Sequence, residues 1–154
     1  MKDKKISKLG AILVSFIMLA FTINVAAQGQ HHKFTKQELT DFIHAVKKVI
    51  PIQKEGQEKM AIKIRKNDFT VKEYNDILSK IQKKKDVDLP RKRMQAFNVL
   101  AAEVKKIQEE YHLKIAHELN NEGLTMDKYD EILVAYQKDP EVKSRINKLM
   151  QENN

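Results

Sequence analysis

The sequence predicts an all-α protein, a helical bundle built from two tandem hairpin repeats of about 55 residues and a short C-terminal helix. Three observations lead to this fold class. Gly and Pro are scarce, apolar residues recur at steps of three and four, and the chain matches itself when it is shifted by 55 positions. Each repeat is expected to contain a long helix, a tight capped turn and a short helix.

The composition favours a few long helices. The 154 residues include only 4 Gly and 3 Pro, the residues that most often interrupt helices, and only 6% of the chain is aromatic. Cysteine is absent, which excludes disulfides, thiolate nucleophiles and cysteine-ligated zinc. No cofactor is expected.

Residues 1–27 are interpreted as a signal peptide that is cleaved after Ala27. Four lysines lie within the first eight residues, an apolar stretch covers residues 9–25, and small residues precede the cleavage site. The alternative is an uncleaved N-terminal membrane anchor, because the apolar stretch is nearly long enough to span a bilayer. Either way we expect an exported protein, periplasmic or secreted, with no transmembrane segment after processing.

The remaining chain divides into a short tail and one all-α domain. Residues 28–34 are expected to be a disordered tail, and residues 35–154 a single domain with repeat one at 35–88 and repeat two at 89–154. His31 and His32 in the tail could bind Cu²⁺ or Zn²⁺ weakly, but a plain polar tail is the favoured interpretation.

The internal repeat is the strongest signal in the sequence. Between residues 39 and 87, 49 positions align with the second copy and 14 are identical, where chance gives roughly three or four. The apolar positions that the two copies share form the predicted core. They are Phe42, Val49, Tyr74, Ile77 and Leu78 in repeat one and Phe97, Val104, Tyr129, Ile132 and Leu133 in repeat two.

Capping residues mark where the helices of repeat one begin. Thr35 with Glu38, and Thr70 with Glu73, each have the spacing of a capping box, in which threonine and glutamate bond reciprocally. Pro51 lies inside the first long helix, where we expect a kink.

Repeat two carries equivalent signals at its turns. Gly123 is expected just past the long helix in a left-handed conformation, and Thr125 caps the short helix that follows. Asp139 and Pro140 have the pattern of an N-cap followed by proline at the first helical position, and so open the last helix.

The join between the repeats, residues 83–93, holds six basic and two acidic residues and is the least ordinary surface feature. A solvated connector is the plain interpretation, and weak contact with a polyanion or an anionic membrane surface is the functional alternative. No aromatic residue lies between Tyr74 and Phe97, which argues against a specific nucleic-acid surface. The candidate surface residues are Lys83, Lys84, Lys85, Arg91, Lys92 and Arg93.

A family resemblance rests on the turn of repeat two and on the helix before it. The turn reads Glu-Gly-Leu-Thr over residues 122–125 and is followed by Tyr129 and Asp139-Pro140, and the helix carries Phe97 and the run Ile-Gln-Glu-Glu-Tyr over residues 107–111. This pattern resembles the family known as domain of unknown function 4168, small exported bacterial proteins with a helical repeat. The resemblance implies the location and the fold, and no reaction.

No catalytic or metal site is predicted. His112 and His117 are five residues apart, which places them on different sides of a helix, and the carboxylates lie on polar helix faces. We therefore expect a non-enzymatic protein that acts through surface contacts with a protein partner in the cell envelope or with itself. A holdase-like chaperone and, more remotely, an enzyme are the alternatives.

Overall fold

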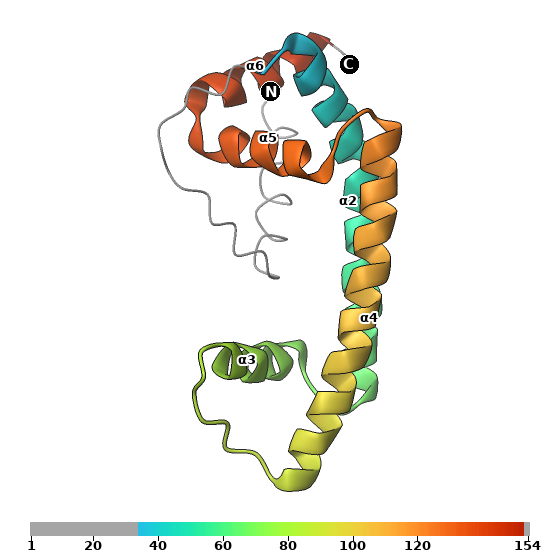
Figure 1. Cartoon of the computed structure of the whole chain (residues 1–154), viewed down its shortest axis with the longest axis vertical. Coiled ribbons are helices and arrows are strands. Elements are labelled where there is room, and N and C mark those ends of the chain that lie inside the picture. Colours follow the sequence, from blue (N-terminus) through green and yellow to red (C-terminus); the bar gives the residue numbers. More distant parts are fainter. Residues whose placement is uncertain (1–33, 153–154) are drawn as a thin grey trace, which may run out of the picture. The chain divides into compact units, whose positions relative to one another are not determined.

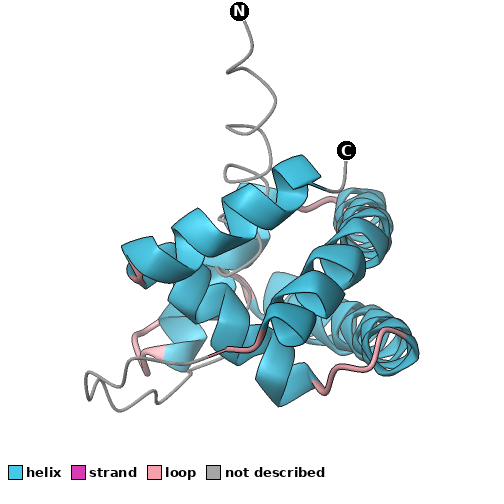
Figure 2. Cartoon of the chain, turned by 90° about the horizontal axis from the view of Figure 1, so that it is seen from above, coloured by secondary structure: helices cyan, strands magenta, loops and turns pink. Residues whose placement is uncertain are grey.

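The computed structural model describes residues 34–152, and these residues belong to one compact unit that starts at Phe34. They form five helices and no strand, which confirms the all-α class (Figure 1, Figure 2). The helices are α2 (Lys36–Lys66), α3 (Val71–Gln82), α4 (Arg91–Asn121), α5 (Met126–Lys138) and α6 (Pro140–Glu152). The predicted signal peptide, its cleavage site and the two tail histidines lie outside the described residues.

The two long helices, α2 and α4, run antiparallel and side by side. Lys63 of α2 pairs with Glu103 of α4 at 2.8 Å, and Lys59 pairs with Glu110 at 3.3 Å, so positions earlier in α2 meet positions later in α4. Each helix has 31 residues and is therefore about 46 Å long. Pro51 lies within α2, which continues past it as one helix. The expected kink there stays a prediction.

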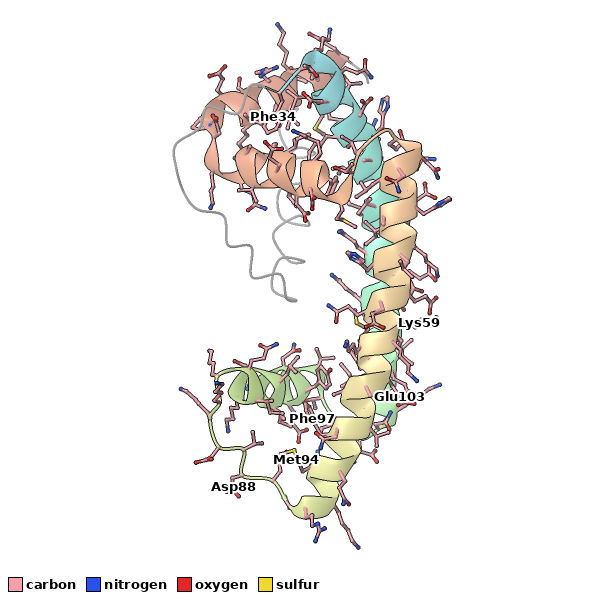
Figure 3. The ribbon with its side chains drawn as sticks, in the orientation of Figure 1. Phe34, Lys59, Asp88, Met94, Phe97 and Glu103 are labelled. Carbon is pink, nitrogen blue, oxygen red and sulfur yellow. The ribbon has the colours of Figure 1, made fainter. Side chains whose placement is uncertain are left out.

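One end of this pair is closed by α3. A cluster of buried side chains joins the last turns of α2, the turn that follows it, α3 and the first turns of α4, and Figure 3 shows Phe97 of this cluster between α3 and α4. The ring of Phe97 lies 5.3 Å from the ring of Tyr74, centre to centre. The cluster contains Met60, Ile64, Phe69, Tyr74, Ile77, Phe97, Leu100 and Val104.

The other end of the pair is covered by α5 and α6. Here Tyr129 of α5 packs on Phe42 of α2 with the ring centres 5.2 Å apart. Phe34 is also buried, with 5% of its surface exposed, and its carbonyl accepts a 2.7 Å hydrogen bond from Arg145 of α6. Residue 34 is thus part of the folded unit, and the expected disordered tail can extend only to residue 33, because burying this ring stabilises the packed state.

Three of the helices are followed by a residue in the left-handed backbone conformation. Asp68 has a φ of 61°, Lys84 of 52° and Gly123 of 79°. After Asp68, the backbone N–H of Phe69 donates to the carbonyl of Ile64 at 3.3 Å. After Gly123, the backbone N–H of Leu124 donates in the same way to the carbonyl of Leu119 at 2.9 Å. This arrangement is a Schellman motif, which satisfies the last free carbonyls of the helix. The motif sets the direction in which each short helix leaves the long one.

None of the helices among residues 34–152 combines the length and the apolar character needed to cross a bilayer.

Candidate interaction surface

Charge is distributed unevenly along the described residues. Residues 62–99 carry eleven basic and five acidic side chains, a net charge of +6. The other described residues, 34–61 and 100–152, carry thirteen basic and fifteen acidic side chains, a net charge of −2. Residues 62–99 contribute most of the hydrophobic cluster at the α3 end of the molecule, and we call them the basic end.

Most of the basic side chains in the basic end are exposed and unpaired. Eight of the eleven are exposed and form no ion pair among the described residues. They come from the end of α2, from α3, from the join and from the start of α4, so they are not gathered in one groove. The eight are Arg65, Lys66, Lys80, Lys83, Lys84, Lys85, Arg91 and Lys92.

Arg93 differs from the other basic residues predicted for this surface. Its guanidinium donates to one carboxylate oxygen of Glu73 at 2.7 and 3.2 Å and to the carbonyl of Asp68 at 3.1 Å. It also lies over the ring of Phe69, 4.5 Å from the ring centre. Arg93 therefore connects α4 to α3 and to the preceding turn, and it is not a free surface charge.

The same contact corrects the second predicted capping box. Thr70 does accept a hydrogen bond from the backbone N–H of Glu73, at 3.0 Å. The Glu73 carboxylate, however, turns to Arg93 instead of to the Thr70 backbone. Two hydrogen bonds from a charged guanidinium are stronger than one from a neutral backbone N–H, which explains why the Glu73 carboxylate binds Arg93.

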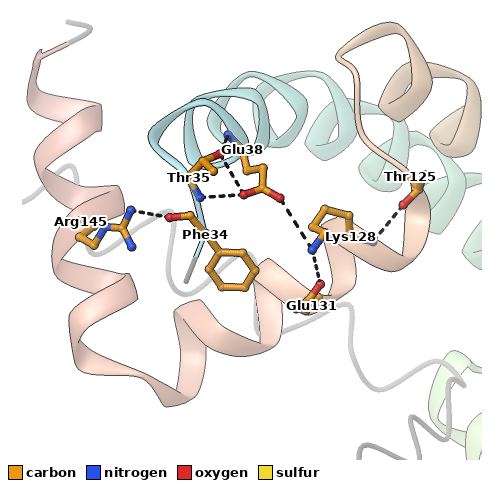
Figure 4. Close-up of polar contacts among 7 residues, drawn as sticks. All are labelled: Phe34, Thr35, Glu38, Thr125, Lys128, Glu131 and Arg145. Atoms are coloured by element: carbon orange, nitrogen blue, oxygen red, sulfur yellow. Dashed lines mark hydrogen bonds and ion pairs between the residues drawn. The ribbon is translucent and has the colours of Figure 1, made fainter. Parts of the chain in front are cut away.

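The other predicted caps form hydrogen bonds of the expected kind. At Thr35 both bonds of the capping box are present, with the Glu38 carboxylate accepting from the Thr35 N–H at 2.7 Å (Figure 4). Thr125 accepts from the backbone of Lys128 at 3.2 Å. Asp139 accepts from the backbone of Glu141 at 2.8 Å, and α6 begins at Pro140.

The predicted core residues are inward-facing, with two partial exceptions. Leu78 and Leu133 are half-buried, and the others are buried. Burial raises the pKa of Tyr129 well above its usual range, and its buried hydroxyl has no hydrogen-bond partner among the described residues. Tyr74 is also buried, and burial raises its pKa as well. Neither tyrosine is placed to exchange protons near neutral pH.

Most of the large aliphatic side chains that are exposed in the described part of the chain belong to the basic end. Five large hydrophobic residues in the described part of the chain are exposed, and four of them lie in residues 62–99. Val99 on α4 is 63% exposed and Ile81 on α3 is 42% exposed, and Ile62 and Val71 complete the set. The fifth, Leu113, lies farther along α4. The basic end thus combines positive charge with apolar surface.

A shallow groove of about 340 Å³ lies between α3 and the join. Its charged groups have both signs, and one pair of them, Lys72 and Asp76, is closed by a 2.6 Å contact that raises the pKa of the lysine. The groove is lined by Thr70, Lys72, Glu73, Asp76, Ile77, Lys80, Val87, Asp88 and Leu89. The charged side chains of the groove are exposed except that of Glu73, which is half-buried and paired with Arg93.

Metal-ligating side chains do not converge within residues 34–152. No group of three or more His, Asp or Glu side chains there could hold an ion. His44 approaches only Glu122, with 3.9 Å between the imidazole Nδ1 and a carboxylate oxygen.

Sequence reasoning missed the tight crossing of α2 and α4. A Cβ atom added to Gly56 would lie 2.8 Å from Cγ of Tyr111, so the glycine makes room for the ring. The Tyr111 hydroxyl donates to Glu55 at 2.6 Å. Positions 56 and 111 differ by the repeat shift of 55, and that coincidence was the available signal.

A family model matches part of the chain. Residues 87–146 match the model described as domain of unknown function (DUF4168). The match covers the end of the join, all of α4 and α5, and the first half of α6. The comparisons with curated proteins and with solved structures gave no match.

Proposed function

We propose that this chain, which carries a DUF4168 domain at residues 87–146, is an exported, non-enzymatic helical protein whose basic end binds an acidic component of the cell envelope. One observation carries the proposal: exposed, unpaired basic residues are concentrated in residues 62–99, while the rest of the described chain is slightly acidic. A protein folded without regard to a partner has little reason to collect like charges at one end, because they repel one another.

We propose that the helical domain arose by tandem duplication of one hairpin repeat. The Phe42–Tyr129 and Tyr74–Phe97 ring pairs have the same interplanar angle of 38°, and their members correspond under the shift of 55. Each pair takes one ring from each half. An isolated half therefore lacks the partner for its own ring, so the two halves are best viewed as one folding unit.

The two halves differ where the function is proposed. Tyr136 of α5 is buried, and Lys143 of α6 lies over its ring. The position that corresponds to Tyr136 in the first half is Ile81, which is exposed. Likewise Ala135 is buried, and its counterpart Lys80 is exposed. At these two positions the first half exposes a lysine and an isoleucine where the second half buries its side chains.

The proposal is tested by capture from a detergent-free cell-envelope extract. Chains starting at residue 28 are crosslinked in the extract, and the captured protein, glycan and lipid are analysed. The test variant carries Lys83→Gln, Lys84→Gln and Lys85→Gln, and the control carries Lys47→Gln, Lys48→Gln and Lys54→Gln. All six lysines are exposed and unpaired among the described residues, so the two variants lose the same charge.

We expect the unaltered chain and the control to capture the same component and the test variant to lose it. Equal capture by all three chains, or no capture by any, would contradict the proposal.

A further inference from the structure

We infer that the acidic component is a lipid surface: the basic end docks peripherally on a bilayer that contains anionic phospholipid. The inference rests on the proposed function and specifies its partner. It is carried by the coincidence of eight exposed, unpaired basic side chains with four exposed aliphatic side chains in residues 62–99.

The charges fit an extended anionic surface better than a compact acidic ligand. The eight basic residues come from α2, α3, the join and α4, so no single groove holds them. The groove beside α3 instead carries Glu73, Asp76 and Asp88 among its lysines, which disfavours an anion inside it. A membrane interface presents many phosphates over a wide area and attracts dispersed lysines and arginines within a Debye length.

The aliphatic side chains distinguish a bilayer from a soluble polyanion. Val99 and Ile81 gain nothing from a fully hydrated polyphosphate or glycan, but both can enter the boundary between headgroups and acyl chains. These residues lie on α4 and α3, the elements that also contribute Arg91, Lys92 and Lys80. Basic and apolar groups on the same elements are the usual composition of surfaces that lie on membranes.

The mode of binding is peripheral. Among residues 34–152 no helix is suited to spanning a bilayer. The cluster that contains Tyr74 and Phe97 is packed within the basic end, so docking requires no unfolding there. Binding is expected to weaken as salt rises, since exposed charges are screened.

Vesicle flotation tests the inference. Chains starting at residue 28 are mixed with vesicles of phosphatidylcholine alone or of phosphatidylcholine with phosphatidylglycerol. We expect flotation with the anionic vesicles only. The Lys83→Gln, Lys84→Gln, Lys85→Gln variant should bind on the order of 100-fold more weakly, because each basic residue near the surface contributes about fivefold.

Two further variants make the result specific. The Lys47→Gln, Lys48→Gln, Lys54→Gln control should bind nearly as well as the unaltered chain, because on α2 these lysines lie about 12 Å or more from residue 62. Ile81→Gln with Val99→Gln should weaken vesicle binding and leave binding to inorganic polyphosphate unchanged. Circular dichroism of each variant establishes that it is folded.

Three results would overturn the inference: binding to phosphatidylcholine alone, equal losses in the two lysine variants, or no effect of the aliphatic variant on vesicle binding. If instead the join lysines are needed for capture from the envelope extract while no chain floats with vesicles, the partner is an acidic protein or glycan. In that case the lipid inference fails and the proposed function stands.

Discussion

Gly56 of α2 lies directly against the ring of Tyr111 of α4, and the two positions correspond to each other in the internal repeat. A Cβ at residue 56 would approach Cγ and Cδ1 of the tyrosine to 2.8 and 2.9 Å. These atoms belong to the inner part of the ring, so no flexible tip can move aside. The close approach of the long helices therefore depends on one missing methyl group.

Gly56→Ala is expected to destabilise the protein by about 1–2 kcal/mol, although alanine is intrinsically better in a helix by about 1 kcal/mol. The steric cost of displacing the ring outweighs the gain in helix propensity. Urea unfolding followed by circular dichroism measures the change.

The control for this prediction is a double-mutant cycle with Tyr111→Ala. Without the ring, Gly56→Ala should become stabilising, because only the propensity term remains. A stabilising effect of Gly56→Ala in the unaltered chain would show that α2 and α4 are not held this closely.

Phe97→Ala and Phe42→Ala test whether the two ring pairs make equivalent contributions. The two phenylalanines are only 1% and 2% exposed, and each packs against a tyrosine from the other half. We expect each substitution to cost about 3–5 kcal/mol in the free energy of unfolding. Chemical denaturation of the two variants gives the comparison. A loss below about 1 kcal/mol at either site, far under the usual cost of such a truncation, would contradict the crosswise packing of the halves.

Local spacing rules predicted the helices well. The first long helix was expected to begin after Thr35 and occupies Lys36–Lys66, because apolar steps of three and four and a threonine cap act within a few residues. Gly123 could be assigned to a left-handed turn for the same reason. These features depend on near neighbours in the chain, which a single sequence displays directly.

Contacts between residues far apart in the sequence could not be predicted from local spacing. Glu73 had a local partner in Thr70 and a distant one in Arg93, and only the fold brings the guanidinium within 2.7 Å. Likewise the join was visibly basic in sequence, but packing adds Arg65 of α2 and exposed Val99 of α4 to the same end. The candidate surface was thus only partly predictable, because three helices assemble it.

Lys84→Gly is expected to stabilise the protein by about 0.5–1 kcal/mol. Lys84 has a φ of 52°, a conformation that costs a residue with a Cβ roughly 1–2 kcal/mol and that glycine adopts freely. Part of this gain is offset by the greater freedom of glycine in the unfolded chain. The adjacent Lys83→Gly is the matched control: its φ is −84°, so glycine there should destabilise. Thermal unfolding distinguishes the two, and equal effects would argue against the left-handed turn.

Glu38 makes the stability of the α2 N-terminus depend on pH. The backbone N–H and the hydroxyl of Thr35, with a smaller contribution from Lys128, bind the ionised carboxylate and lower the pKa of Glu38 below its usual range (Figure 4). A group whose pKa is lower in the folded than in the unfolded state stabilises the fold above the unfolded value. That contribution is lost as pH falls through the lowered folded value.

Glu38→Gln should therefore reduce stability at neutral pH and matter progressively less in acid. Glutamine keeps an oxygen that can accept from the Thr35 N–H but carries no charge for Lys128, so the difference between the two chains should shrink as pH falls below about 4.5. Urea unfolding at a series of pH values measures the difference. Glu58→Gln, at an exposed position without an ion pair among residues 34–152, controls for the loss of one negative charge. A gap between the unaltered chain and the Glu38→Gln variant that stays constant from neutral to acidic pH would mean that the carboxylate at the cap is not held in its ionised form by Thr35.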